Sequence, residues 1–368
     1  MPERRTRRVE GSHLKVIDLF AGCGGLSLGF QQSGRFTPVA AVEKDLYAAA
    51  TYATNFGEDH VHWGDIAEWV KGDLPDADVV VGGPPCQGFS NLGAKRDDDE
   101  RNDLWERYVD TLVKVKPKVF LLENVDRFLK SRQFEALREE TKEGGLLADY
   151  GLDYGILRAT DYGAAQLRKR AIVIGTRRDL KQVLLPTTQL AAEGWRTVKD
   201  AMSDLKARIH WSKVNLPAER TCEVFGVAVP GGYSAEELHI TRRYEPMSRK
   251  RFRDIPYGGN RFDLREELQA PCWIKHKTGS GDVMGRLIWE KPSVTIRTEF
   301  FKPEKGRYLH PEEHRALSHH EAARLQGFPD SFVWCGTKLE IARQIGNAVP
   351  VELAEALALH IADGLQGS

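Results

Sequence analysis

The first half of the chain alternates between short apolar runs and longer stretches with helical periodicity. Apolar, β-branched runs predict strands at 16–20, 37–45, 61–66, 77–85 and 118–125. Helical spacing of apolar residues predicts helices at 26–34, 46–56 and 103–117. The last of these strands is almost continuously apolar, which is typical of a parallel strand covered on both faces. The alternation predicts a doubly wound α/β sheet with right-handed crossovers.

The alternating pattern ends after a further predicted strand within 168–180. Residues 186–300 show no comparable period and are rich in proline, glycine and scattered aromatic residues. This composition predicts a second, irregular domain. Helical patterns return at 319–328 and 349–365.

Length and charge restrict the class of protein. A chain of 368 residues corresponds to about two domains and can bury a core without disulfides or structural metals. Lysine plus arginine is 53 and aspartate plus glutamate is 53, so any nucleic-acid-binding surface has to be local. No apolar stretch approaches membrane-spanning length. Residues 1–13 carry arginines with no apolar core behind them, which excludes a secretion signal and predicts a disordered tail.

The five cysteines are widely spread and include no Cys-x-x-Cys pair, so we expect neither a disulfide framework nor a metal site, and a reducing cytoplasm fits best. Cys86 follows Gly-Gly-Pro-Pro at the end of the predicted strand 77–85. Ligands bind at the carboxyl edge of such sheets, and two prolines fix the direction of the chain. Cys86 is therefore a candidate nucleophile, with a small buried packing residue as the alternative.

Charged residues lie at the ends of neighbouring strands. Glu123 and Asn124 end the strand at 118–125, and a carboxyl group there is either paired with a cation or kept protonated by burial. In the protonated form it is a general acid. Arg168 and Arg170 precede the next strand, where alternation predicts that they share one face. The alternatives are an acidic loop residue and a solvated basic edge.

A glycine-rich turn at 21–25 joins a strand to a helix, which allows the backbone to approach a ligand closely. Glu43 ends the next strand, where a ribose is bound in nucleotide-binding sheets, and Asp65 suits an adenine amino group. The alternative is a tight turn without a ligand. The glycine spacing is not Gly-x-Gly-x-x-Gly, which weakens a nicotinamide site.

In this order the motifs resemble those of the DNA (cytosine-5) methyltransferase family over nearly the whole chain. The segments that carry the resemblance are DLFAGCGG (18–25), VEKD (42–45), GDI (64–66), GGPPCQGFS (82–90), RNDLW (101–105), ENV (123–125), QLRKR (166–170), LSHHEAARLQGFPD (317–330) and QIGNAVPVELA (344–354). The resemblance implies a Rossmann-like, S-adenosylmethionine-dependent methyltransferase fold with a mixed sheet. It implies a catalytic domain at 14–185 plus 337–366 and a smaller target recognition domain at 186–336.

The same resemblance implies methyl transfer from S-adenosylmethionine to carbon 5 of cytosine, with S-adenosylhomocysteine as product. The Cys86 thiolate would attack carbon 6, and Glu123 would act as general acid toward ring nitrogen 3. Asn124 would hold the site together, while Arg168 and Arg170 would contact the base oxygen and favour the thiolate. The base has to be flipped out of the duplex. No residue stands out as the base that removes the carbon 5 proton.

The implied cofactor pocket draws on both ends of the chain. Its residues are Phe20, Gly22, Gly24, Glu43, Asp65, Ile66, Pro85, Leu104, Asn347 and Val349. Glu43 would hold the ribose and Asp65 the adenine, and the return of Asn347 and Val349 assigns the last helix to the first domain. Lys44 departs from the family, which often has an aromatic or apolar residue there, and its aliphatic stem would cover the adenine instead.

DNA contacts are expected from two segments. The loop at 87–102 would close over the flipped base, and 242–253 is the most basic stretch of the second domain. The predicted DNA-contacting residues are Ser90, Arg96, Arg101, Arg242, Arg243, Arg249, Arg251 and Arg253. A solvated loop is the alternative for the second segment.

The chain is thus predicted to be a monomeric, cytoplasmic enzyme of the prokaryotic restriction–modification type. Its expected partners are double-stranded DNA and, acting separately, a cognate restriction endonuclease; no membrane contact is expected. A tRNA cytosine-5 methyltransferase is the first alternative, and the long recognition segment argues against it. A catalytically silent DNA-binding protein is disfavoured by the intact site, and a nicotinamide-dependent dehydrogenase is the most distant alternative.

Overall fold

The structure is a computed structural model, which describes residues 13–85, 103–210, 212–217, 220–275, 278 and 280–367. Four predicted site residues lie outside the described residues, namely Cys86, Ser90, Arg96 and Arg101. The expected N-terminal tail also lies outside them, except for His13.

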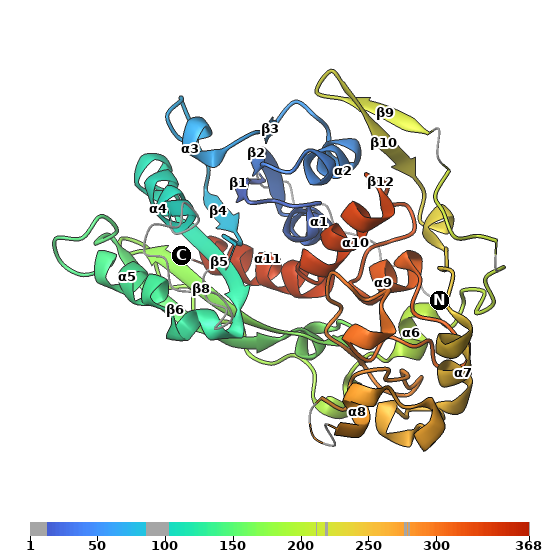
Figure 1. Cartoon of the computed structure of the whole chain (residues 1–368). Coiled ribbons are helices and arrows are strands. Elements are labelled where there is room, and N and C mark those ends of the chain that lie inside the picture. Colours follow the sequence, from blue (N-terminus) through green and yellow to red (C-terminus); the bar gives the residue numbers. More distant parts are fainter. Residues whose placement is uncertain are drawn as a thin grey trace, which may run out of the picture.

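A seven-stranded mixed sheet forms the centre of the molecule (Figure 1). Its strands are β1 Leu14–Leu19, β2 Phe36–Glu43, β3 Val61–Trp63, β4 Val79–Gly82, β5 Val119–Val125, β6 Tyr150–Arg158 and β8 Lys169–Arg177. They lie in the order β3-β2-β1-β4-β5-β8-β6. The first five strands of this order are parallel to one another, and β8 is antiparallel to both its neighbours, β5 and β6. The predicted doubly wound mixed sheet is confirmed.

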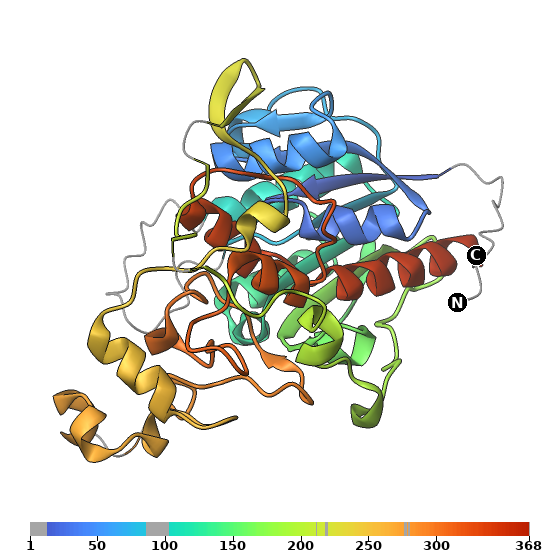
Figure 2. The same cartoon turned by 90° about the vertical axis from the view of Figure 1, so that its right-hand side faces the viewer.

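Helices cover both faces of this sheet (Figures 1 and 2). They are α1 Gly25–Gln32, α2 Leu46–Phe56, α3 Ile66–Trp69, α4 Asp103–Val115, α5 Arg132–Glu140 and α11 Val351–Gln366. Helix α10, Lys338–Asn347, packs against α2 instead. Successive side chains of β5 face opposite layers: Val119 and Leu121 pack with α1 and α11, whereas Phe120 and Leu122 pack with α4 and α5. This two-sided burial explains the nearly continuous apolar run in the sequence.

The C-terminal helix α11 and the residues just before it dock on α1 at two glycines one turn apart. A Cβ atom at Gly25 would lie 2.8 Å from the carbonyl oxygen of Val349, and one at Gly29 would lie 2.4 Å from the Cβ of Ala354. The two backbones approach closely because both side chains are absent. Among the described residues no single helix is long and apolar enough to cross a membrane, and only α10 and α11 together, across a bend of 42°, reach such a length and composition.

The second region lies between β8 and α10. Its elements are α6 Val198–Met202, β9 Thr221–Val224, β10 Val227–Tyr233, α7 Pro246–Asp254, α8 Pro271–Lys275, β11 Ser293–Val294, α9 His319–Leu325 and β12 Trp334–Cys335. The short strand β7, Gln166–Leu167, pairs with β11 and joins the two regions. The 3-10 helices are η1 Asp126–Lys130, η2 Ala159–Tyr162, η3 Ala192–Gly194, η4 Glu236–Leu238, η5 Arg261–Asp263, η6 Glu266–Leu268 and η7 Pro303–Lys305.

Two substructures stand out in this region (Figures 1 and 2). The antiparallel sheet β12-β10-β9 lies against α2, where the Cys335 backbone N–H donates to Thr51 Oγ1 at 2.9 Å. Helix α7 belongs to a separate part with its own small core, which includes Phe252, Ile255 and Met284. Both parts flank the edge of the central sheet at which the parallel strands end.

Candidate active site

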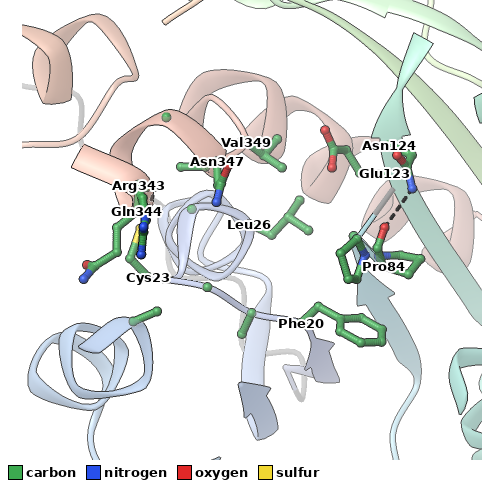
Figure 3. A pocket seen from close by; sticks show the side chains of 18 of the residues that line it. Phe20, Cys23, Leu26, Pro84, Glu123, Asn124, Arg343, Gln344, Asn347 and Val349 are labelled. Carbon is green, nitrogen blue, oxygen red and sulfur yellow. Dashed lines mark hydrogen bonds between the residues drawn. The ribbon is translucent and has the colours of Figure 1, made fainter. Parts of the chain in front are cut away.

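A cavity of about 1000 Å³ lies at the carboxyl ends of the parallel strands (Figure 3). The predicted catalytic and cofactor residues that line it are Phe20, Gly22, Glu43, Asp65, Ile66, Pro85, Leu104, Glu123, Asn124, Arg168, Arg170, Asn347 and Val349. Gly24 does not line it: a Cβ atom there would lie 2.4 Å from the Phe56 ring, so this glycine lets the turn pack against α2. The fold therefore brings both ends of the chain to one site.

The β1–α1 loop bends sharply into the cavity. Phe20 and Gly22 have φ values of 58° and 56°, in the left-handed region that costs energy for any residue other than glycine. The bend exposes the Phe20 ring to the cavity, where Figure 3 shows it opposite Leu26. It also turns the Gly22 N–H toward Glu43, to which it donates a hydrogen bond of 2.8 Å.

Glu43 is held by two backbone donors at the end of β2. Its Oε2 accepts from Gly22 and its Oε1 accepts from the N–H of Asp45 at 2.7 Å. Burial raises the pKa of this carboxyl group, and the backbone hydrogen bonds oppose that rise. The result is a fixed acceptor on the cavity wall, which suits a ligand hydroxyl group.

Asp65 and Lys44 form an ion pair on another wall of the cavity. Lys44 Nζ lies 2.7 Å from Asp65 Oδ2, while Asp65 Oδ1 accepts from the N–H of Ala67 and caps α3. The hydrogen bond from Lys44 is the main cause that lowers the pKa of Asp65. The ammonium group, rather than only the aliphatic stem, thus contributes to this wall.

Glu123 and Arg170 face each other from the paired strands β5 and β8. Arg170 Nε lies 2.6 Å from Glu123 Oε1, and both side chains are nearly buried. A Cβ atom at Gly83 would lie 3.0 Å from Glu123 Oε2, and one at Gly82 would lie 2.6 Å from the carbonyl oxygen of Leu19. A side chain is therefore excluded at the two positions for different reasons: Gly82 allows β4 to approach β1, and Gly83 leaves room for the Glu123 carboxylate.

Asn124 ties the end of β5 to the end of β4. Its Nδ2 donates to the carbonyl oxygen of Pro84 at 2.9 Å, which Figure 3 marks, and its Oδ1 accepts from the N–H of Val125. This hydrogen bond fixes the backbone two residues before Cys86, which itself lies outside the described residues.

Arg168 differs from the expectation that both arginines face one base. It is 2% exposed, and its Nη1 donates to the carbonyl oxygen of Ile296 at 2.8 Å while its Nη2 donates to that of Gly346 at 3.0 Å. Burial is the main cause that lowers the pKa of the guanidinium. Its Nη1 and Nη2 groups thus donate within the protein, while its Nε has no hydrogen-bond partner among the described residues. Arg170 is the arginine whose guanidinium contacts Glu123.

Helix α10 contributes cavity residues that sequence analysis missed. Glu340, Arg343 and Gln344 line the cavity together with Asn347, and so does Thr298 from the second region. The helical spacing of positions 340, 343, 344 and 347 puts these four residues on one side of α10. Helical spacing upstream of the predicted Asn347 could therefore have identified these cavity residues from the sequence.

The predicted arginine patch of the second region divides into exposed and anchored residues. Arg243, Arg249 and Arg253 are exposed. Arg251 instead donates to the carbonyl oxygen of Leu268 at 2.7 Å and lies over the Trp273 ring. In the same way Arg242 lies over the Tyr244 ring, with its guanidinium 5.5 Å from the ring centre. Three arginines therefore remain on the surface near α7.

The sheet order and the cavity at the carboxyl ends of its parallel strands together define a Rossmann-like methyltransferase. A family model for C-5 cytosine-specific DNA methylase matches residues 14–363. The chain belongs to this family and is a DNA (cytosine-5)-methyltransferase.

Relatives of known name cover nearly the whole chain. The type II methyltransferase M.DdeI of Desulfomicrobium norvegicum is 32% identical over 95% of this chain and 88% of its own length. M1.HphI of Haemophilus parahaemolyticus is 34% identical over 94% of this chain and 86% of its own. A crystal structure from E. coli, described as a prophage-encoded DNA modification methyltransferase, has a TM-score of 0.70 and 27% identity, covering 96% of this chain and all of that one. The Dnmt2 methyltransferase of S. pombe shares the fold with a TM-score of 0.64 and 18% identity, covering 96% of this chain and 99% of that one.

Proposed function

We propose that this enzyme methylates carbon 5 of a cytosine within a specific double-stranded DNA sequence, with S-adenosylmethionine as donor. The observation that carries the proposal is the Glu123–Arg170 pair, which lies in the same cavity as the Glu43 carboxylate. One end of this cavity thus suits a pyrimidine edge, and the other suits a ribose.

The cavity residues fit the donor. Gln344 Oε1 is buried without a hydrogen-bond partner among the described residues, and Gln344 lines the cavity, so a ligand N–H group has an acceptor there. Glu43 would hold the ribose hydroxyls, Asp65 the adenine amino group, and Phe20 would contact the adenine ring. When bound, S-adenosylmethionine supplies an electrophilic methyl group.

Glu123 and Arg170 match the edge of the target base. Nitrogen 3 and oxygen 2 are neighbouring acceptors on cytosine. Glu123 is paired with Arg170 in the structure, so it would have to take up a proton as the base binds; it would then donate to nitrogen 3 while Arg170 donates to oxygen 2. Negative charge that develops on the ring is then neutralised at both atoms, and general acid help of this kind contributes about 10²–10⁴-fold in rate.

Cys86 would provide the nucleophile. Its thiolate forms a bond to carbon 6, which makes carbon 5 electron-rich; after methylation a base takes the carbon 5 proton and the carbon–sulfur bond breaks. The Asn124–Pro84 hydrogen bond supports this role because it fixes the chain that leads to Cys86.

The type II relatives support a role in a restriction–modification system. The enzyme would then act in the cytoplasm as a monomer, with S-adenosylhomocysteine as product and with a separate endonuclease that cuts the same sequence. Arg249 and Arg253 on α7 would contact DNA phosphates.

Methyl transfer from a radiolabelled donor to duplex DNA and to tRNA tests the proposal. We expect label in DNA, located at carbon 5 of cytosine, and none in tRNA. Cys86→Ser should abolish incorporation while S-adenosylhomocysteine binding, measured by calorimetry, stays near wild type. Label only in tRNA, or a Cys86→Ser variant with near wild-type rate, would overturn the proposal.

A further inference from the structure

Three buried polar side chains lie between the cavity and the second region. We call Gln166, Arg168 and Gln326 the polar clasp; they are 0%, 2% and 0% exposed. They come from the strand β7, the segment before β8 and the end of α9. Buried polar groups of this kind are costly unless their hydrogen bonds are made, so their partners indicate what they do.

One side of the clasp holds the end of α10. The last carbonyl groups of any helix have no partner within it, and α10 ends at Asn347. Gln326 Nε2 donates to the carbonyl oxygen of Ile345 and, at 3.3 Å, to that of Ala348. Arg168 Nη2 donates to the carbonyl oxygen of Gly346 at 3.0 Å. A guanidinium at this helix end also opposes the negative end of the helix dipole.

The other side of the clasp holds the second region. Arg168 Nη1 donates to the carbonyl oxygen of Ile296, and the N–H of Ile296 donates to Gln166 Oε1 at 3.2 Å. Gln166 Nε2 in turn donates to Gln326 Oε1 at 2.5 Å, which closes the network. The neighbours of Ile296, Thr295 and Arg297, both line the cavity.

We propose that Arg168 and Gln326 are positioning residues that fix the turn at 345–349 and thereby set the affinity for S-adenosylmethionine, and that neither touches the target base. The reason is that this turn carries Asn347 and Val349 into the cavity wall, and its carbonyl groups are held by these side chains. The inference rests on the proposed function, because it takes the cavity as the donor site.

Two substitutions test the clasp, Arg168→Lys and Gln326→Met, because each removes donors to the turn and keeps an unbranched side chain. Tyr150→Phe is the matched control: it removes a buried hydrogen bond of 2.7 Å to the carbonyl oxygen of Pro117, at the opposite end of β5. For each protein we measure S-adenosylhomocysteine affinity by calorimetry without DNA, the melting temperature, and KM and kcat with duplex DNA.

We expect both clasp variants to lose about tenfold in S-adenosylhomocysteine affinity, the equivalent of about one buried hydrogen bond, and to raise KM for the donor by a similar factor. At saturating donor the kcat of Gln326→Met, whose side chain does not line the cavity, should stay within about twofold of wild type, since the Glu123–Arg170 pair is kept. The control should lower the melting temperature and leave the affinity unchanged.

Wild-type affinity in folded Gln326→Met would overturn the inference, even if Arg168→Lys fails to fold. A lower kcat with unchanged KM in Arg168→Lys would also overturn it, because that result puts Arg168 on the base. If the wild-type enzyme itself binds no S-adenosylhomocysteine, the proposed function fails. If the wild type binds it and the clasp variants bind it equally well, only the inference about the clasp fails.

Discussion

Asp18 is a buried carboxylic acid that lies beneath the glycine-rich loop at 21–25. Its Oδ2 accepts from Ser27 Oγ at 2.7 Å, and Ser27 Oγ in turn lies 2.8 Å from the hydroxyl of Tyr52. Asp18 Oδ1 has no hydrogen-bond partner among the described residues. Burial raises the pKa of Asp18 to about 7, and the negative charge of Glu43 adds to the rise. The protonated and ionised forms of Asp18 are therefore about equally populated in the folded enzyme at pH 7, and the protonated form dominates below it.

This protonation predicts a pH-dependent stability. Because the pKa of Asp18 rises from 3.8 to about 7 on folding, its contribution is lost as pH rises through that window. Asp18→Asn removes the titration, so the wild type should lose about 1 kcal/mol per pH unit relative to the variant between pH 5 and about 7. Urea denaturation at several pH values measures this difference.

Asp73→Asn, at an exposed position, is the control and should change little across the same range. A difference between wild type and Asp18→Asn that stays constant from pH 5 to pH 8 would contradict the prediction.

At the residue scale, the sequence indicated the groups that follow parallel strands. Glu43, Glu123 and Asn124 all line the cavity because parallel strands end at one edge. Arg168 could not be separated from Arg170 by alternation, since the carbonyl groups that bind Arg168 come from residues distant in sequence. Hydrogen bonds between distant segments leave no periodic signal.

At the element scale, helices and strands with a strong pattern were predicted well, and the antiparallel edge was not. The predicted helix 46–56 has the bounds of α2, and 118–125 contains β5. Strand β6 was missed because its half-exposed YGLDYGILR sequence mixes glycine and polar residues with apolar ones. The hairpin β9–β10 was missed although its strands pair locally, Val224 with Val227, because Pro230, Gly231 and Gly232 interrupt the apolar pattern of β10.

The close approach of α1 and α11 makes a prediction for a single methyl group. A Cβ atom at Gly29 would lie 2.4 Å from that of Ala354, so Gly29→Ala should force the helices apart. Overpacking costs about 1–3 kcal/mol, whereas replacing glycine by alanine within a helix gains about 1 kcal/mol. Because the clash is severe, we expect the cost to lie toward the upper end of its range and to exceed the gain. Urea denaturation should show a lower free energy of unfolding for Gly29→Ala.

Gly72→Ala is the matched control, because a Cβ atom there meets only the carbonyl oxygen of Trp69 at an ordinary 3.5 Å. A Gly29→Ala enzyme more stable than wild type would mean that α11 does not approach α1 this closely.

At the scale of the whole molecule, zero net charge coexists with a local basic surface near α7. We predict that DNA affinity falls steeply as salt increases, because binding of each phosphate releases counterions. Replacing Arg249 and Arg253 by alanine should reduce the slope of log affinity against log salt by about 0.9 for each phosphate that the variant no longer binds. Fluorescence anisotropy with duplex DNA at several salt concentrations measures the slope.

Lys142→Ala is the control, because it also removes an exposed positive charge but lies beyond the end of α5, where it pairs with Glu139. An affinity that does not change with salt, or a double variant with the wild-type slope, would remove α7 from the DNA interface.

The docking of α11 on α1 also has a consequence for biosynthesis. The wall that Asn347 and Val349 supply is among the last parts of the described chain to leave the ribosome, whereas β1 and α1 are among the first. A nascent polypeptide therefore carries an unfinished cavity wall until residues 347–349 have been synthesised. A product terminated before α10 would lack α11, so the face of α1 that carries Gly25 and Gly29 would be exposed to solvent and the cavity would be incomplete.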